Sequence, residues 1–479
     1  MKRALILAAA LLSGCTLGPD YFRPLFDSPA KYRIDFPAAA EVANAKWWEQ
    51  FNDPVLNQLV EDALRGNLEI RAAAARVDRF LGLLTTTRSQ FFPQIGYSYD
   101  ASSNRASRVG QPPLGPNADN TYNLYQGAIG AGWQLDLFGR VRRQSESAQA
   151  QVYASEQGRR GVILSLVTTA AVSYINLRAL DRQLEIARAT AANYGDTQKL
   201  FALRLQGGVI SDVEMGQVES QYQQALAAIP SLEQSVAAQE NLISVLLGRV
   251  PGPIPRGKTI DELVPPAIPA GLPSELLERR PDILQAEQNL VSANAGIGAA
   301  KALYFPQISL TGAVGSVSTA FSSFLSGPAG VASLALGLSG PLFTFGAIEG
   351  QVRSAEAGKE EALLFYQQTI LNALRETNDA LVGSQKKREE LEALTRRVAA
   401  LRNYARLSRL RFDNGAASYV EVLIAENDLF GAELNAVSTQ AERHTQIINV
   451  YKAMGGGWVD AGDAIARPQD PAVPPSKGK

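Results

Sequence analysis

The chain has 479 residues, of which 46% are hydrophobic and 19% are charged, a composition that supports a large buried core rather than disorder. Its formal net charge of -1 at pH 7 excludes the basic face that a nucleic-acid-binding protein needs. One cysteine and one histidine exclude an internal disulfide, a metal cluster and a nucleophile–base catalytic pair. We therefore expect a folded protein that is not an enzyme, holds no metal and binds no nucleic acid.

The N-terminal stretch, MKRALILAAALLSGCTLGPD, has the pattern of an export signal. Lys2 and Arg3 precede a run of apolar residues too short to span a bilayer, because a spanning helix needs about 20 residues. Cys15 resembles the acylated cysteine of a bacterial lipobox. We expect a lipoprotein signal peptide at 1–14 and a covalent lipid on Cys15, consisting of diacylglycerol and an N-acyl group such as palmitate. Thr16 in second place of the mature chain favours sorting to the outer membrane.

Several short sequences occur twice in the same order, which indicates an internal duplication. FPQI at 92–95 returns at 305–308, and LF at 137–138 returns at 342–343. RLQGGVISDVE at 204–214 returns as RFDNGAASYVE at 411–421. The predicted organisation is an N-terminal extended segment at 15–50, a first repeat at 51–250, a linker at 251–275, a second repeat at 276–458 and a disordered tail at 459–479.

Each predicted repeat contains a helix, two strands and a long helical hairpin. Apolar residues alternate with small or polar ones in GAIGAGWQLDLFG and VASLALGLSG, and the partner strands begin near Ile95 and Ile308. Strands of about 10 alternating residues can cross a membrane, although a soluble sheet packed on a helix gives the same alternation. The segments 141–204 and 347–411 contain no proline, and the second predicts a rod about 100 Å long. The fold class expected is therefore α+β, with rods too long for an ordinary globular domain.

The repeated glycine sequences are typical of turns at the tips of the two hairpins. Gly208 and Gly415 can adopt the positive φ that ends a helix. Ser211 and Ser418 are suited to N-cap the returning helices, and a glutamate three residues after each serine predicts a capping box in both turns.

Two other motifs are interpreted as structural. GPIPRGKT at 252–259 has the letters of a phosphate-binding P-loop, but a helix rather than a strand is expected before it. Pro253 and Pro255 also lack N–H groups that a phosphate cradle needs, so this stretch is expected to be a linker. His444 lies on the apolar stripe of a predicted helix and is expected to pack there.

Longer sequence motifs resemble one family of membrane proteins. They are PDYFRP after Cys15, the WWEQFNDPVLNQLVEDALRGN and ERRPDILQAEQNL segments, and the closing YKAMGGGW. Together with the two FPQI strands and the two glycine turns, they resemble the TolC-like outer-membrane factor family, in particular its OprM/NodT-type outer-membrane efflux lipoproteins. The resemblance implies a homotrimer with a twelve-stranded β-barrel, four strands per chain, continued by a long periplasmic α-helical coiled-coil barrel.

The resemblance also implies roles for the hairpin tips. In this family the tips meet a periplasmic adaptor (membrane fusion) protein and close the channel at rest. The residues expected to carry that role are Arg204, Gly208, Ser211, Arg411, Gly415 and Ser418. Asp212 and Asp413 are gate candidates, because carboxylates crowded around a threefold axis repel one another and attract cations. The second tip has Ala417 where the OprM type has an aspartate, so the ring of charge is expected to be either moved or weakened.

The predicted function is a passive outer-membrane channel of a tripartite efflux system that exports small molecules such as drugs. Four strands cannot close a barrel, and open strand edges in lipid leave backbone groups unpaired, so membrane strands require several copies. Two copies would give eight strands with a filled interior, whereas three leave room for a lumen. The partners implied are an inner-membrane RND pump, the adaptor and outer-membrane lipid. Two alternatives stay open: a channel for type I protein secretion, and a soluble periplasmic coiled-coil scaffold.

Overall fold

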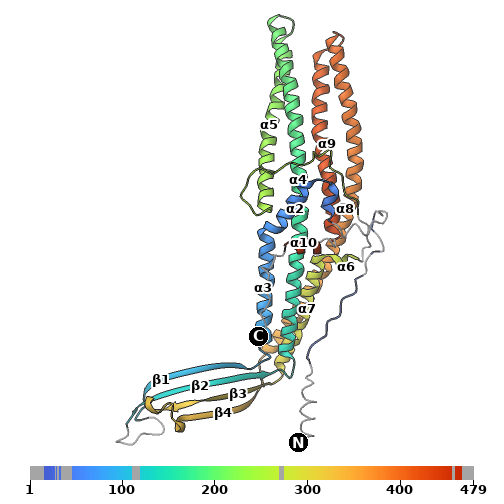
Figure 1. Cartoon of the computed structure of the whole chain (residues 1–479). Coiled ribbons are helices and arrows are strands. Elements are labelled where there is room, and N and C mark those ends of the chain that lie inside the picture. The colour runs from blue at the N-terminus through green and yellow to red at the C-terminus, as the bar shows by residue number, and fades with distance from the viewer. Residues whose placement is uncertain are drawn as a thin grey trace, which may run out of the picture. The chain divides into compact units, whose positions relative to one another are not determined.

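The structure is a computed structural model that describes residues 16–26, 29, 32–33, 46–109, 119–268, 275–455 and 459–466 (Figure 1). The chain forms two compact units. The first unit contains the segments up to Leu25, Arg76–Ser155 and Ala286–Tyr366. The second contains Phe26–Ala75, Glu156–Gln285 and the chain from Gln367 onward. Each unit therefore takes segments from both predicted repeats, so that the repeats and the compact units are different divisions of the chain.

A four-stranded antiparallel sheet forms the first unit together with helical segments. The strands are β1 (Gln94–Arg105), β2 (Thr121–Leu135), β3 (Gln307–Ser318) and β4 (Gly330–Ser339). They lie in the order β1-β2-β3-β4, so β1 and β4 form the edges (Figure 1). Two short 3-10 turns, η5 (Phe321–Ser323) and η6 (Gly327–Ala329), connect β3 to β4.

The sheet does not bury one face in the way that a soluble sheet does. Every residue of β4 is exposed, including Leu334, Leu336 and Leu338, and most of β1 is exposed as well. A soluble sheet packed on a helix would bury its apolar face. The alternation predicted from the sequence is therefore confirmed, and the exposed leucines favour strands that face lipid or another copy of the chain.

Two helical hairpins form most of the second unit. The first consists of α4 (Arg140–Gln206) and α5 (Asp212–Leu246), and the second of α8 (Ala347–Asp413) and α9 (Tyr419–Ala453). α4 and α8 both have 67 residues, and α5 and α9 both have 35, so the duplication is preserved in helix length. A rod of 67 residues is about 100 Å long. α5 continues through Pro230, so this proline does not end the helix.

Shorter helices accompany the hairpins. They are η2 (Trp47–Phe51), α2 (Pro54–Gly66), α3 (Leu68–Ser89), α6 (Leu276–Arg279), α7 (Pro281–Lys301), η4 (Ala302–Tyr304) and α10 (Val459–Ala466). The aromatic residues of η2 are buried, and the Trp47 ring stacks on Tyr451 of α9 with centroids 5.4 Å apart. Among the described residues, α4 is the one helix long and apolar enough to cross a membrane, and most of its apolar stretch is buried inside the protein.

The described part of the linker after α5, up to residue 268, encloses a buried carboxylate. Asp53, which N-caps α2, accepts hydrogen bonds from the Tyr174 hydroxyl at 2.8 Å and from the Lys258 backbone N–H at 3.0 Å. A Cβ at Gly257 would lie 2.1 Å from an Asp53 oxygen, so only glycine fits there. The segment that matches the P-loop pattern therefore packs around Asp53 of the same chain.

His444 packs as predicted. Its side chain is buried, with the ring 5.6 Å from that of Phe51 in an edge-to-face arrangement. Burial lowers the pKa of His444 to about 4, so it stays neutral near pH 7.

Strand register corrects one part of the predicted duplication. β1 and β3 start 213 residues apart, at Gln94 and Gln307. The partners of these two residues, Gly132 and Ser339, are 207 residues apart, as are the first residues of α4 and α8. The LF pairing of 137–138 with 342–343 is therefore wrong. Phe138-Gly139 corresponds instead to Phe345-Gly346, and both glycines have positive φ.

The predicted disordered tail is also wrong in part. Residues 459–466 form α10, in which Val459 and Asp463 are buried. Arg159 forms an ion pair with the Asp463 carboxylate. Two ion pairs, Arg159–Asp463 and Arg160–Asp460, and the apolar contact of Val459 hold this helix. The remainder of the predicted tail lies outside the described residues.

Candidate functional site: the hairpin tips

The two tip turns have the same backbone. Gly208 and Gly415 both have φ 70°, as predicted, and nothing lies within 4 Å of a Cβ placed on either. Glycine is thus required by the left-handed conformation and not by space. In both turns the following residue donates its N–H to the carbonyl of an arginine, Val209 to Arg204 at 2.9 Å and Ala416 to Arg411 at 2.8 Å. This pattern is a Schellman-type helix ending.

The N-caps of the returning helices differ. Ser211 and Glu214 form the predicted capping box: the Ser211 hydroxyl accepts from the Glu214 N–H at 3.3 Å, and Glu214 accepts from the Ser211 N–H at 2.8 Å. The hydrogen bond from the Ser211 backbone lowers the pKa of Glu214. The second capping box is wrong, because Ser418 occupies the N-cap position without a side-chain cap.

The second capping box is absent because its glutamate has other partners. The Glu421 carboxylate accepts from Arg411 at 2.8 Å and from the Ser408 hydroxyl at 3.3 Å, both on the outgoing helix α8. Arg411 also donates to the Ala416 carbonyl within the turn, at 3.3 Å. The second hairpin is therefore closed by an ion pair across its own two helices.

Arg204 occupies the position equivalent to Arg411 but contacts the other hairpin. Its guanidinium lies 5.7 Å from the centroid of the Phe201 ring and 5.3 Å from that of Phe412. Such cation–π contacts are worth about 0.5–1 kcal/mol at exposed sites. Because Phe201 belongs to α4 and Phe412 to α8, Arg204 links the two tips.

An aromatic cluster lies beneath this arginine. Phe201 packs against Tyr419 with ring centroids 4.2 Å apart, and Phe412 packs against Tyr419 at 5.0 Å. Val218, Val422 and Leu423 complete the buried part of the cluster. The sequence analysis missed these aromatics because they do not follow the duplication: Phe201, for example, corresponds to Ser408. Their placement within about two helical turns of a tip glycine was the available signal.

The two gate candidates lie near the turns in different surroundings. Asp212 is exposed at the first position of α5. Asp413 is exposed at the last position of α8, and its carboxylate lies 3.6 Å from the Arg409 guanidinium. The structure thus places both carboxylates at the tips, and Asp413 has a cationic neighbour in Arg409.

A groove of about 630 Å³ lies between the two hairpins, on the α5–α9 side of the tips. Its lining is mixed, with exposed Val213 from α5 and Val420 and Ile424 from α9. The polar part comes from Gln217, Ser220, Gln221, Asn427 and Asp428. A groove that combines apolar side chains with amide and hydroxyl groups suits a docked helix, which needs apolar contact and side-chain hydrogen bonds.

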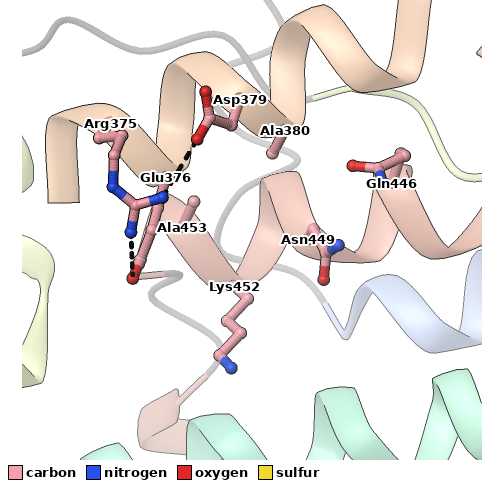
Figure 2. A pocket seen from close by; sticks show the side chains of 8 residues that line it. All are labelled: Arg375, Glu376, Asp379, Ala380, Gln446, Asn449, Lys452 and Ala453. Atoms are coloured by element: carbon pink, nitrogen blue, oxygen red, sulfur yellow. Dashed lines mark hydrogen bonds and ion pairs between the residues drawn. The ribbon is translucent and has the colours of Figure 1, made fainter. Parts of the chain in front are cut away.

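A second pocket, of about 230 Å³, lies between α8 and α9 (Figure 2). Arg375 extends toward two carboxylates, 3.2 Å from Asp379 and 3.9 Å from Glu376 (Figure 2). Gln446 and Asn449 line the pocket from α9. The Arg375 guanidinium is thus paired with neighbouring carboxylates, and Lys452 adds a second cation to the lining.

Some predicted features have no structural description. Cys15 and the signal peptide before it lie outside the described residues. Among the described residues, no group of three or more histidine, cysteine, aspartate or glutamate side chains has the arrangement of a metal site.

Comparison with known proteins places these features in one family. A family model described as "Outer membrane efflux protein" matches residues 59–249 and 272–456, once for each repeat. The chain is 31% identical over 456 residues to the cation efflux system protein CusC of Escherichia coli O6:H1, covering 94% of this chain and 97% of CusC. A crystal structure of CusC superposes with a TM-score of 0.81 at 29% identity, covering 92% of this chain and all of that one.

Two further relatives have names that indicate different roles. The solvent efflux pump outer membrane protein SrpC of Pseudomonas putida is 31% identical over 462 residues, 95% of this chain and 97% of SrpC. The probable outer membrane lipoprotein SilC of Salmonella typhimurium is 29% identical over 466 residues, 96% of this chain and 99% of SilC. A cation exporter and a solvent exporter match this chain equally well, so overall identity does not discriminate between cargoes.

Proposed function

Because the chain belongs to the outer membrane efflux protein family, we propose that it is the outer-membrane channel of a tripartite efflux system, working with a periplasmic adaptor and an inner-membrane RND pump. The chain is a non-enzymatic transport component located in the outer membrane. In the proposed system the pump supplies the energy and the channel is a passive duct for small molecules. The names of the relatives support efflux rather than protein secretion.

The observation that carries the proposal is the sheet with two unpaired edges. β1 and β4 have no strand beyond them in the chain as described, and β4 is exposed along its whole length. In lipid, unpaired backbone groups cost several kcal/mol each, so the edges must pair with other copies. Three copies of four strands give a twelve-stranded barrel that is wide enough for a lumen.

The proposed adaptor site is the groove between α5 and α9 together with the two turns. Its apolar residues are exposed in this chain, and its edges offer amide and hydroxyl groups to a second helix. Arg204, Gly208, Ser211, Arg411, Gly415 and Ser418 shape the turns beside it, and Asp212 and Asp413 are proposed as the charged rim of the gate.

The N-terminal lipid is part of the same proposal. SilC is named a lipoprotein, and Cys15 directly follows the apolar run of an export signal. Diacylglycerol and an N-acyl chain on Cys15 would anchor each copy beside the barrel. Mass spectrometry of the mature N-terminal peptide tests this, and an unmodified Cys15 in purified outer membranes would contradict it.

A groove variant tests the adaptor site in a strain that lacks the native chain. Ser220→Arg places a long cation in the groove, and we expect loss of adaptor co-purification and of drug resistance while the trimer remains intact. Ser235→Arg, further along the same helix and outside the groove lining, is the matched control. Normal adaptor binding by the Ser220→Arg trimer would contradict the proposed site.

A further inference from the structure

Two aromatic rings stack at the junction between the repeats. Phe138 follows β2 and Phe305 precedes β3, and their ring centroids are 4.8 Å apart with planes inclined by 26°. β2 and β3 pair next to this stack, with Leu135 opposite Ile308. The stack thus joins the last strand of the first repeat to the first strand of the second repeat.

The duplication supplies a second pair of aromatic residues at equivalent positions. Phe345 corresponds to Phe138, because each precedes the positive-φ glycine that leads into a long helix. Phe92 corresponds to Phe305, because each begins an FPQI sequence. These two residues flank the edge strands β4 and β1, which lie three strand spacings apart, about 14 Å. The Phe92 and Phe345 rings therefore cannot stack on each other within the open sheet of one chain.

Both rings are exposed in the single chain. Phe92 is 67% exposed, and Phe345 is fully exposed. Phe345 also has φ 49°, and among the described non-glycine residues only Asn52 shares a positive φ. A bulky residue in this region of φ is strained, and strain of this kind persists where a surrounding contact requires it. No such contact is evident around a fully exposed ring, which points to a surface outside the chain.

We propose that Phe345 of one copy stacks on Phe92 of the next copy, so that the internal Phe138–Phe305 stack is repeated at each of the three junctions between chains. The occupant of this surface is a second copy of the chain, because the edge strands β4 and β1 are the continuation of the same sheet. The inference rests on the trimer of the proposed function.

The same correspondence predicts the register across the junction. The pair Leu135–Ile308 maps onto Leu342 and Ile95, and the pair Gly132–Thr311 maps onto Ser339 and Ser98. The second pair lies within both strands, so backbone pairing of β4 with the next copy's β1 leads directly to the aromatic stack. Phe345 and Phe92 then become buried against each other at the rim of the barrel.

Cross-linking of the full-length chain in outer membranes tests the stack. The variant Phe92→Cys/Phe345→Cys is treated with a short bis-maleimide, and we expect most of the protein to run as covalent dimers and trimers on a denaturing gel. Phe138→Cys/Phe305→Cys is the internal counterpart and is expected to cross-link within one chain, leaving the monomer band. The single variants Phe92→Cys and Phe345→Cys show whether Cys15 contributes, and both are expected to stay monomeric.

A matched control distinguishes a specific stack from random collision. Phe92→Cys/Leu325→Cys places the second cysteine in the exposed β3–β4 connection, at the opposite end of the sheet, and is expected to give no covalent dimer. An absence of cross-link in Phe92→Cys/Phe345→Cys, with the trimer intact on a native gel, would overturn the stack and leave the proposed function standing. A monomeric unsubstituted chain would overturn the trimer itself.

A double-mutant cycle gives an independent readout that does not need cysteine. Phe92→Leu and Phe345→Leu are each expected to lower the temperature at which the trimer dissociates, and the double variant is expected to be no worse than the more damaged single variant. Strictly additive shifts would contradict contact between the two rings.

Discussion

The two hairpin tips share one backbone and use it differently. Both turns have a glycine at φ 70° and the same pair of backbone hydrogen bonds. In the first tip a local capping box closes the turn, and Arg204 reaches across to Phe412 of the other hairpin. In the second tip Arg411 is held by Glu421 of its own hairpin. After duplication, the backbone was retained while the side chains diverged, so that the two tips interlock rather than repeat each other.

The bases of the hairpins show the same divergence. Leu246 and Ala453 occupy equivalent positions at the ends of α5 and α9. Asn67 donates to the Leu246 carbonyl at 2.9 Å, whereas Arg280 donates to the Ala453 carbonyl at 2.9 Å. Asn67 is a neutral cap, but the Arg280 guanidinium is buried and also pairs with Asp282 and Glu376.

The largest expected effect comes from removing the side chain that caps the base of each hairpin, Arg280 or Asn67. Arg280→Ala removes a buried cation with three acceptors and is expected to destabilise the protein by about 2–3 kcal/mol, because hydrogen bonds to charged groups contribute most. Asn67→Ala is expected to cost about 1–2 kcal/mol, from a lost cap and an unpaired carbonyl. Denaturant unfolding in detergent measures both. Equal losses would contradict the difference between the two bases.

The tip caps give a smaller contrast. Ser211→Ala removes a side chain that caps α5, and it is expected to destabilise the first hairpin by about 1 kcal/mol. Ser418→Ala removes a hydroxyl that caps nothing, so its cost is expected to be a few tenths of a kcal/mol at most. Hydrogen exchange of the amides in the first turns of α5 and α9 reports each tip separately. Faster exchange at α9 in Ser418→Ala would show that the second capping box forms in solution.

The smallest expected effect is a pH dependence confined to the second hairpin. Burial raises the pKa of Glu426, opposed by the Arg409 charge. The folded state therefore binds this proton more tightly than the unfolded state. Its stabilising contribution is complete below the ordinary pKa of a glutamate and is lost as the pH rises through the raised value. Carboxylates with a lowered pKa, such as Glu214, contribute the opposite slope, so the effect of Glu426 is measured as a difference. Across this range the melting temperature of Glu426→Gln should fall less, or rise more, with pH than that of the unaltered chain.

Glu219, the equivalent residue of the first hairpin, is the matched control. It accepts hydrogen bonds from Gln198 at 3.1 Å and from Gln223 at 2.7 Å. Glu219→Gln removes a carboxylate at the same position of the other hairpin, so it controls for the loss of one acidic group there. A changed pH dependence of the melting temperature in Glu219→Gln, but not in Glu426→Gln, would contradict the assignment of this effect to the second hairpin.

Much of the backbone was predictable from the sequence, because glycine turns and alternating strands depend on local chemistry. Gly208 and Gly415 signalled left-handed turns, and the proline-free segments signalled rods. The absence of the second capping box could not be predicted in this way. Glu421 pairs with Arg411 rather than with Ser418, and that preference depends on how the two helices of the hairpin pack. The aromatic cluster at Phe201, Phe412 and Tyr419 was likewise invisible, since it joins helices that are distant in the sequence.

Short repeated sequences were also a weaker guide to the alignment of the two repeats than backbone geometry was. The two LF pairs suggested one alignment of the repeats, but strand register and the positive φ at Gly139 and Gly346 gave another. Only the second alignment makes Phe345 equivalent to Phe138. The inferred junction between chains depended on that correction.

The most direct measurement of the central claim is ion conductance through the purified protein in a planar bilayer. A trimeric channel closed by interlocked tips should conduct weakly, and Arg204→Ala should raise the conductance because it breaks a contact between the two hairpins. Arg411→Ala, which loses a contact within one hairpin, should change it much less. A protein that forms no conducting pore, or one that opens with Arg411→Ala and not with Arg204→Ala, would contradict the account.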